Sequence, residues 1–418
     1  PQLINGESSS WLANEDPIAG SIRIASNLNS SVLAIQGPPG SGKTYTGARM
    51  IIDLHRQGKK IGITAVSHKV IRKLTESTIE ICRQENTSIF FVHKIDNSKV
   101  DLPPEISEID DSDKVRTEIN NNKIGCGTAW FWAEDKSQGI LDYLFIDEAG
   151  QMSLAYVLAA SRAAKNLILL GDPQQLEQPQ KGAHPEGSDV AALTYLLDGN
   201  LTMPKDKGLF LETTRRLHPS ICKFTSEIFY DNRLKSLAGL ENQVITCIDQ
   251  IEGSGLLYIP IEHTGNQNRS LEEIYVIVAL VNRLLDGGKW TDEKAQSHFL
   301  QKTDIMIIAP FNSQVSALRE RLPGLSIGTV DKFQGQEAPV VIYSMTSSSP
   351  EDAPRGMGFL YNPNRLNVAT SRAKCLSIIV AAPKLFNPEC HSIEQMKWAN
   401  ALCRYIELAK TVVPEDLI

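Results

Sequence analysis

The chain has 418 residues, of which 42% are hydrophobic and 22% are charged, and its formal net charge is -7. A globular chain of this length is too long for one hydrophobic core, so we expect two or three domains. No apolar run is long enough for a membrane helix, and residues 1–30 lack the basic start and apolar block of an export signal, so neither is indicated. The acidic balance argues against a protein coated by nucleic acid but is compatible with a local basic groove.

Seven cysteines are scattered along the chain without any Cys-x-x-Cys pair. This pattern predicts neither a zinc site nor a disulfide framework and is typical of reduced thiols inside a cell. We therefore expect the cytoplasm, or the nucleus of a eukaryote, and we separately expect a monomer. Because the chain begins at Pro1 rather than methionine, we also expect an excised or processed part of a longer protein.

The first half of the chain alternates apolar strands with amphipathic helices. Segment 96–123 breaks this pattern with many acids, two consecutive prolines and three consecutive asparagines, so we expect an exposed insertion there. Alternation of strands and helices predicts a parallel sheet covered on both faces. The expected strands are 31–36, 60–66, 88–95, 124–129, 141–146 and 166–170, and the expected helices are 17–28, 44–57, 69–83 and 154–164.

The second half repeats the pattern and predicts another α/β domain. The expected strands are 210–214, 255–261, 304–309, 326–330, 340–345 and 376–381, and the expected helices are 218–230, 272–286, 312–321, 364–374 and 392–409. We expect the boundary within 199–207, which gives an N-terminal domain of residues 1–200 and a C-terminal domain of residues 201–418.

Residues 37–44 match the phosphate-binding loop G-x-x-x-x-G-K-[ST] and lie between an apolar strand and a helix, as the motif requires. A Gly-rich turn that merely ends a strand is a poor alternative, because the full match is rare by chance. We expect Lys43 to bind phosphate and Thr44 to bind Mg²⁺. The nucleotide-binding residues are then Gly37, Pro38, Pro39, Gly40, Ser41, Gly42, Lys43 and Thr44.

Two carboxylates follow the strand at 141–146, at the end where α/β sheets bind their ligands. We expect Asp147 to hold Mg²⁺ and Glu148 to polarise the attacking water, which favours a hydrolase over a kinase. After the next strand, Gln175 is expected beside the γ-phosphate, where it can sense whether that phosphate is present. Solvated acids after a strand are the bland alternative.

Two other classes of nucleotide-binding protein fit less well. Residues 147–150 match the D-x-x-G of GTPases, and residues 93–96 resemble their guanine-reading motif. In GTPases the guanine-reading motif follows D-x-x-G, but here it precedes D-x-x-G and begins with histidine, so the GTPase interpretation fails. A small-molecule kinase would not require the long second domain.

Seven sequence blocks in this order resemble the superfamily 1 helicases, in the branch of the nonsense-mediated-decay RNA helicase and the Okazaki-fragment nuclease-helicase. The resemblance extends from about residue 30 to residue 382 and implies two tandem RecA-like P-loop domains with ATP in the cleft between them. The blocks are GPPGSGKT (37–44), TAVSH (64–68), DEAGQ (147–151), GDPQQL (171–176), RRLHPSI (215–221), TVDKFQGQE (329–337) and NRLNVATSRAK (364–374).

The resemblance also implies roles for single residues. Arg216 and Arg372 match two arginine fingers, and Gln175 matches the γ-phosphate sensor. Gly335 and Glu337 match the nucleotide-side loop of the second domain. Positions that match contacts to the nucleic-acid backbone are Thr64, Ser67, His68, Thr128, Pro310 and Thr329, although each could equally cap a helix.

Two departures concern recognition of the base. The family reads adenine with a glutamine ahead of the phosphate loop, yet no glutamine lies between Gln2 and Gln36. Arg215 stands where the family stacks an aromatic ring on the base, and its planar guanidinium can also stack. We therefore expect ATP to be used with loose discrimination against other triphosphates.

The expected function is an ATP-dependent helicase or translocase that moves 5′ to 3′ on single-stranded DNA or RNA, with ATP and Mg²⁺ as cofactors. An ATP-switched remodelling factor without processive unwinding is the alternative. It stays open because segment 96–123 suits a solvated flap better than a nucleic-acid clamp, and because the barrel that the resemblance implies ahead of the first domain is not evident within these residues. Further domains, such as a nuclease, are expected in a longer chain, and the choice between DNA and RNA is open.

Overall fold

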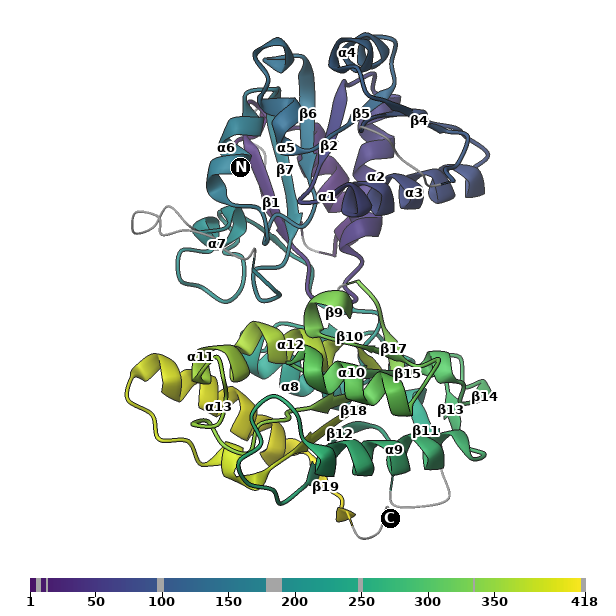
Figure 1. Cartoon of the computed structure of the whole chain (residues 1–418). Helices are drawn as coiled ribbons and strands as arrows, with labels where there is room; N and C mark the ends of the chain where they lie inside the picture. The colour runs from purple at the N-terminus through teal and green to yellow at the C-terminus, as the bar shows by residue number, and fades with distance from the viewer. Residues whose placement is uncertain are drawn as a thin grey trace. The chain divides into compact units, whose positions relative to one another are not determined.

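The computed structural model describes residues 1–4, 9–12, 14–95, 101–177, 190–246, 251–333 and 335–414 (Figure 1). The chain forms two compact α/β units. Unit 1 comprises Pro1–Pro173 and Glu177–Leu211, and unit 2 comprises Gln174–Leu176 and Glu212–Ile418. The boundary expected between residues 200 and 201 falls ahead of this division, because a short strand at Gly208–Phe210 still belongs to the first sheet.

Unit 1 is built on an eight-stranded sheet in the order β4-β3-β5-β2-β6-β7-β1-β8, and its neighbouring strands are parallel. The central strands are short apolar runs with both faces buried, as expected of a covered parallel sheet. The strands are β1 (Val32–Gln36), β2 (Ile61–Thr64), β3 (Phe91–Lys94), β4 (Ile106–Ile109), β5 (Ile124–Cys126), β6 (Leu141–Ile146), β7 (Ala164–Gly171) and β8 (Gly208–Phe210).

The helices of unit 1 cover both faces of this sheet. Crossovers through α2 and α3 run along the sheet in one direction, and those through α5 and α6 run in the other. Because such crossovers are right-handed, the two pairs lie on opposite faces (Figure 1). The helices are α1 (Pro17–Ser26), α2 (Lys43–Arg56), α3 (His68–Gln84), α4 (Ser112–Asn120), α5 (Ala129–Ala133), α6 (Leu154–Ser161) and α7 (Ala192–Leu197).

The segment expected to be an exposed insertion is instead part of the sheet over residues 101–123. Strand β4 pairs in parallel with β3, and α4 returns the chain to β5. Val115 and Ile119 of α4 are buried, and Arg116 is buried beside them. Asp113 and Glu118 lie on the exposed side of α4, and the other acids of 101–111 precede this helix, so composition alone did not reveal its buried face. Residues 96–100 lie outside the described part of the chain.

Unit 2 contains a six-stranded parallel sheet in the order β16-β15-β17-β18-β12-β19. Its strands are β12 (Gly255–Pro260), β15 (Ile305–Ile308), β16 (Ser326–Gly328), β17 (Ala338–Ser344), β18 (Ala373–Ala381) and β19 (Lys410–Thr411). A small antiparallel sheet of β11 (Val244–Thr246), β13 (Lys289–Thr291) and β14 (Ser297–Phe299) was not predicted from the sequence. Two further short strands, β9 (Thr213–Thr214) and β10 (Lys235–Ser236), pair with each other.

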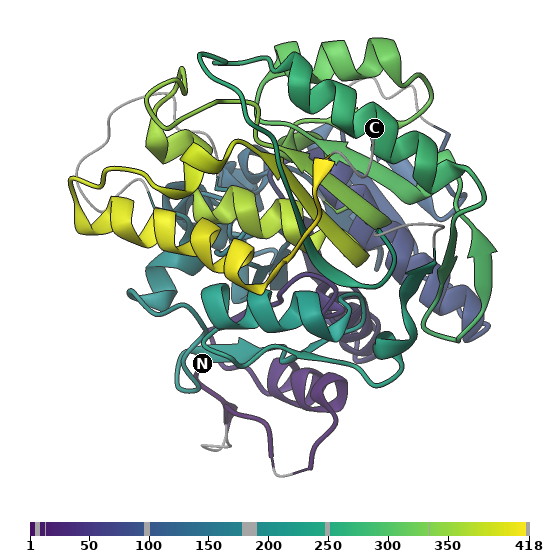
Figure 2. The ribbon, with the colours of Figure 1, turned by 90° about the horizontal axis from the view of Figure 1, so that it is seen from below.

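Helices also cover both faces of the sheet of unit 2. The crossovers through α9 and α10 run in one direction along the sheet, and those through α12 and α13 in the other, so the two pairs lie on opposite faces (Figure 2). The helices are α8 (Pro219–Phe229), α9 (Leu271–Leu285), α10 (Asn312–Arg321), α11 (Met357–Leu360), α12 (Pro363–Ser371) and α13 (Ile393–Leu408). Within the described ranges, no helix is long and apolar enough to cross a membrane.

Candidate functional site

The phosphate-loop residues form a tight turn between β1 and α2. Gly40 and Gly42 have φ values of 73° and 82°, a region that side chains other than glycine rarely adopt. A side-chain carbon on Gly37 would come within 2.7 Å of Lys43 Cβ. The hydroxyl of Ser41 is buried and has no hydrogen-bond partner among the described residues. The turn therefore presents backbone N–H groups and the N-terminus of α2 to a common point, which is the arrangement that binds phosphate.

Lys43 lies beside the two carboxylates that follow β6. Its Nζ is 2.9 Å from Glu148 Oε2 and 3.9 Å from Asp147 Oδ1. Burial alone would lower the pKa of Lys43, but attraction to Glu148 and Asp147 outweighs it and leaves the pKa raised. Burial raises the pKa of Asp147, against the attraction of Lys43. The three side chains thus form one charge cluster at the carboxyl end of the sheet, in which Asp147 is buried and Lys43 and Glu148 are partly buried.

The turns after β6 and β7 pack tightly against each other and against the phosphate loop. Gly37 N donates to the carbonyl of Gly171 at 2.8 Å. A side-chain carbon on Gly150 would come within 2.7 Å of the carbonyl oxygen of Asp172, so only glycine allows this approach. Glu148 itself has a φ of 52°, which turns the chain sharply after the strand. These contacts fix the backbone around the charge cluster.

Gln36 belongs to this site but was not predicted from the sequence. Its side chain is fully buried, and its Nε2 donates to Asp172 Oδ1 at 3.4 Å and to the carbonyl of Leu201 at 3.1 Å. Its Oε1 accepts from Met203 N at 2.7 Å. The only sequence signal was a polar residue at the end of an otherwise apolar strand. Gln36 ties the phosphate loop to two neighbouring loops.

The residues present fit a nucleoside triphosphate with Mg²⁺. Thr44 lies in the first turn of α2, and Asp147 directly follows β6, so a hydroxyl and a carboxylate oxygen are available. Hard oxygen ligands of this kind suit Mg²⁺, which keeps several waters and binds phosphates alongside one or two protein oxygens. The unbonded Ser41 hydroxyl and the raised pKa of Lys43 both suit an anion at the loop.

Arg216 is held by acceptors within unit 2. Its Nε donates to Glu337 Oε2 at 2.5 Å, and its Nη1 donates to the carbonyl of Ser371 at 3.2 Å. Lys374 Nζ contacts the other oxygen of Glu337 at 2.9 Å. Burial tends to raise the pKa of Glu337, but Arg216 and Lys374 outweigh it and lower the pKa. Glu337 therefore organises two cations in the absence of another anion.

Arg372 ends α12 and is only 2% exposed. Its Nη2 donates to Gln175 Oε1 at 3.0 Å, and its Nη1 donates to the carbonyl of Gln336 at 3.3 Å. Gln175 belongs to the short segment Gln174–Leu176 that groups with unit 2 although both of its flanks belong to unit 1. The expected γ-phosphate sensor and one expected arginine finger are thus directly bonded to each other.

The candidate nucleic-acid contacts of unit 1 lie at the carboxyl ends of two adjacent strands, β2 and β5. Ser67 caps α3, and His68 Nδ1 lies 2.9 Å from His93 Nε2. Thr128 precedes α5, and its side chain does not cap that helix. Ser67, His68 and Thr128 are partly exposed, whereas Thr64 is fully buried. The strand order therefore brings these four predicted residues to one edge of the sheet.

The candidate contacts of unit 2 lie beyond β15 and β16. Pro310 and Thr329 line a common pocket of about 200 Å³. Arg215 is exposed, so its guanidinium is available to stack on a base. Gly335 is exposed and has a φ of 76°, which requires glycine at this turn.

Comparisons with known proteins were made for the whole chain. Two family models, each described as an AAA domain, match residues 21–180 and residues 194–384. The chain is 28% identical over 396 residues to mov-10-B.1 of Danio rerio, named a helicase, covering 83% of this chain and 39% of that protein. It is 25% identical over 452 residues to the regulator of nonsense transcripts 1 homolog of Drosophila melanogaster, covering 92% of this chain and 35% of that protein.

One solved structure is reported beside these relatives. Arterivirus nonstructural protein 10, titled a helicase, matches 87% of this chain and 61% of its own, with 15% identity and a TM-score of 0.45. The chain spans well under half of either curated relative's own length.

Proposed function

The chain belongs to the superfamily 1 helicases, and from this premise we propose that it hydrolyses ATP to move along single-stranded nucleic acid. The observation that carries the proposal is the charge cluster at the phosphate loop, where Lys43 Nζ lies 2.9 Å from Glu148 and 3.9 Å from Asp147. Phosphoryl transfer to water requires three groups of this kind: a cation that binds the phosphate, a ligand for the metal ion and a group that orients the attacking water. By the same family resemblance the direction is 5′ to 3′.

In the proposed mechanism, the backbone N–H groups of the phosphate loop and Lys43 hold the β- and γ-phosphates. Thr44 and Asp147 would hold Mg²⁺, which would supply positive charge to the phosphate oxygens. Lys43 then exchanges its contact with Glu148 for a phosphate oxygen, because a triphosphate carries more negative charge than one carboxylate. The released Glu148 carboxylate orients the attacking water and accepts its proton.

Arg216 and Arg372 are proposed to stabilise the charge that develops on the transferred phosphoryl group. Their present acceptors are Glu337 and backbone or amide oxygens of unit 2, and a phosphate would have to compete with these. Gln175 and Arg372 are joined by a hydrogen bond, so a movement of either side chain acts directly on the other. Loss and gain of the γ-phosphate would thereby alter the Gln174–Leu176 segment, which offers a route from hydrolysis to movement.

The rate of ATP hydrolysis by this chain tests the proposal. It is measured without nucleic acid, with single-stranded DNA and with single-stranded RNA, each at low and moderate salt. We expect strong stimulation by at least one polymer, and the stronger one identifies the track. Comparison of the four nucleoside triphosphates tests the loose selectivity inferred from Arg215 and the missing upstream glutamine. Hydrolysis that neither polymer changes would contradict the translocase proposal.

A second candidate, an ATP-switched remodelling factor, is favoured by the net charge of -7, which argues against a surface coated by nucleic acid. Such a factor grips nucleic acid or a partner in the ATP state without separating strands. A strand-displacement assay distinguishes the two, because only a helicase releases the labelled strand.

A further inference from the structure

The pocket beyond β15 and β16 is lined partly by residues without an assigned role. Pro310 and Thr329 line one part of this pocket, and Arg355, Phe359 and Arg365 line another. These three residues come from the segment between β17 and the middle of α12. The pocket is therefore formed by strand ends on one side and by a cationic and aromatic cluster on the other.

Two guanidinium groups lie over the same aromatic ring. The Cζ atom of Arg355 is 4.7 Å from the ring centroid of Phe359, and that of Arg365 is 4.4 Å away. The ring of Phe311, which also lines the pocket, lies 5.7 Å from that of Phe359. Contact with a ring holds a guanidinium in a defined orientation while its N–H groups stay available at the edges.

The two arginines differ in their charge partners. Arg365 Nη1 is 3.4 Å from Asp331 Oδ2, so its charge is partly balanced. Arg355 is exposed, and within the described residues no carboxylate lies at ion-pairing distance from it. Two cations on one ring with a single carboxylate leave a net positive charge at the pocket, which an anion can balance.

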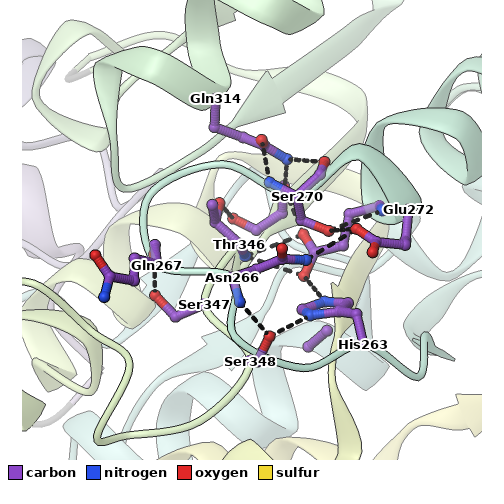
Figure 3. Close-up of polar contacts among 12 residues, drawn as sticks. His263, Asn266, Gln267, Ser270, Glu272, Gln314, Thr346, Ser347 and Ser348 are labelled. Atoms are coloured by element: carbon purple, nitrogen blue, oxygen red, sulfur yellow. Dashed lines mark hydrogen bonds and ion pairs between the residues drawn. The ribbon is translucent and has the colours of Figure 1, made fainter.

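The loop that carries Arg355 starts from a buried polar network (Figure 3). The single backbone N–H of Thr346 is shared by both carboxylate oxygens of Glu273 in α9, each 3.0 Å from the nitrogen, and His263 Nε2 lies 3.2 Å from Oε1. His263 Nδ1 lies 2.7 Å from Ser348 Oγ. Farther along, Ser349 Oγ donates to Asp352 Oδ2 at 3.0 Å, which closes the loop on itself. The segment is thus fixed at its base.

The chain of Ser348, His263 and Glu273 has the residue types of a hydrolase triad. Ser348 is 1% exposed, and the side chains of His263 and Glu273 are fully buried. A substrate cannot reach this serine, and Asn266 N already donates to its hydroxyl oxygen at 2.9 Å. The network therefore positions the loop and does not itself bind a ligand.

We propose that Arg355 and Arg365 together bind one backbone phosphate of single-stranded nucleic acid at this pocket. The guanidinium groups occupy the face of Phe359, so a base cannot stack on it in the same way, and the site recognises phosphate rather than sequence. The neighbouring Pro310 and Thr329, expected from the family resemblance to touch the backbone, fit the same track. This inference rests on the proposed function, because it assumes that the chain binds a single strand.

The site is tested by measuring how labelled oligo-deoxythymidine and oligo-uridine bind to the whole chain. Fluorescence anisotropy gives the affinity at each concentration of a salt series. For Arg355→Ala we expect binding to weaken by about 3- to 10-fold, and the slope of log affinity against log salt to fall by about 0.7, the value for one phosphate contact on a single strand. Arg355→Lys should keep the slope. ATP hydrolysis without nucleic acid should be unchanged in both variants.

Arg321→Ala is the matched control, because Arg321 also lies over an aromatic ring in unit 2, at 4.6 Å from the centroid of Tyr275, but does not line the pocket. It should bind both polymers as the unchanged chain does. If Arg355→Ala has the affinity and salt slope of the unchanged chain, the phosphate site is wrong while the proposed function stands. If the unchanged chain binds neither polymer, both are wrong.

Discussion

Lys43 and Glu148 are paired before any nucleotide arrives, and this pairing has a chemical consequence. At 2.9 Å the ammonium holds the carboxylate that is proposed to orient water. A phosphate that draws Lys43 away leaves that carboxylate free only when substrate is in place. In the proposed mechanism, water is therefore activated only when the triphosphate is bound.

Glu148→Gln tests this role because the amide keeps the shape of the side chain but cannot accept a proton. We expect ATP turnover to fall by about 100-fold or more, as for loss of a general base, while ATP binding is retained. Turnover by phosphate release and binding by a fluorescent nucleotide measure the two effects. Glu80→Gln, which changes an exposed carboxylate of α3, should leave both unchanged. Rapid turnover in Glu148→Gln would exclude the water-activating role.

Arg372→Ala tests the second arginine finger. An arginine that stabilises the transferred phosphoryl group contributes about 10³ or more to the rate, so we expect stimulated turnover to fall by that order. Single-turnover hydrolysis with the better-stimulating polymer measures it, with Arg321→Ala as the control. If Arg372→Ala keeps full stimulated turnover, this arginine is not a finger, and its hydrogen bond to Gln175 has only a structural role.

His93 makes the stability of unit 1 depend on pH. Burial, helped by repulsion from His68 and Arg72, lowers its pKa to about 3, whereas a histidine of the unfolded chain titrates near 6.5. Between these values the unfolded chain binds more protons, so stability is full above about pH 6.5 and falls as the pH is lowered, by at most about 1.4 kcal/mol per pH unit. Urea unfolding at pH values between about 5 and 7 should show this dependence, and His93→Gln should reduce it. An equal pH dependence in the variant would contradict the assignment.

At the scale of elements, the polar network around Glu273 joins the N-terminus of α9 to the loop after β17. Ser344 and Thr346 donate to this carboxylate, and Thr346 has a φ of 72°. Its burial raises the pKa of Glu273 against the hydrogen bonds that lower it. The folded loop therefore depends on a fully buried acid.

Glu273→Ala should destabilise unit 2 by about 3 kcal/mol, because it leaves buried donors without their acceptor. Urea denaturation followed by tryptophan fluorescence measures the change. Glu320→Ala, which removes an exposed carboxylate of α10, should cost about 0.5 kcal/mol or less. Similar costs for the two variants would mean that the network adds no stability.

How far the elements were predictable depends on how local their causes are. The core strands and helices were expected because their apolar periodicity is contained in each segment, as in α2 and β6. Strand β4 and helix α4 were missed because acidic surface residues dominate the composition around Val115 and Ile119. Gln36 was missed because its partners Asp172 and Met203 are 136 and 167 residues away. The phosphate loop, whose chemistry lies in eight consecutive residues, needed no such information.

At the scale of the whole molecule, the groups proposed for hydrolysis are divided between the two units. Lys43, Asp147 and Glu148 belong to unit 1, whereas Gln175, Arg216 and Arg372 belong to unit 2. Neither unit contains a complete set. Activity is therefore expected to be a property of the whole chain.

A chain that ends at residue 211 tests this division, because it contains the phosphate loop and the carboxylates but lacks both arginine fingers. We expect it to bind nucleotide and to hydrolyse it slower than the whole chain by about 10³ or more, the contribution of a missing finger. Nucleotide titration and phosphate release measure the two properties. Hydrolysis at the rate of the whole chain would contradict the roles of Arg216 and Arg372.

The pairing of β8 with β1 decides where such a truncation can be made. Residues 208–210 cover the outer edge of β1, and the Leu211 N–H still donates to the carbonyl of Gln36. A protein cut at residue 200 would leave the apolar strand β1 with unpaired backbone groups at the edge of the sheet, and such edges can recruit strands from other molecules. A fragment that ends at residue 211 therefore keeps β1 covered, whereas one that lacks the last eleven residues of unit 1 is expected to aggregate.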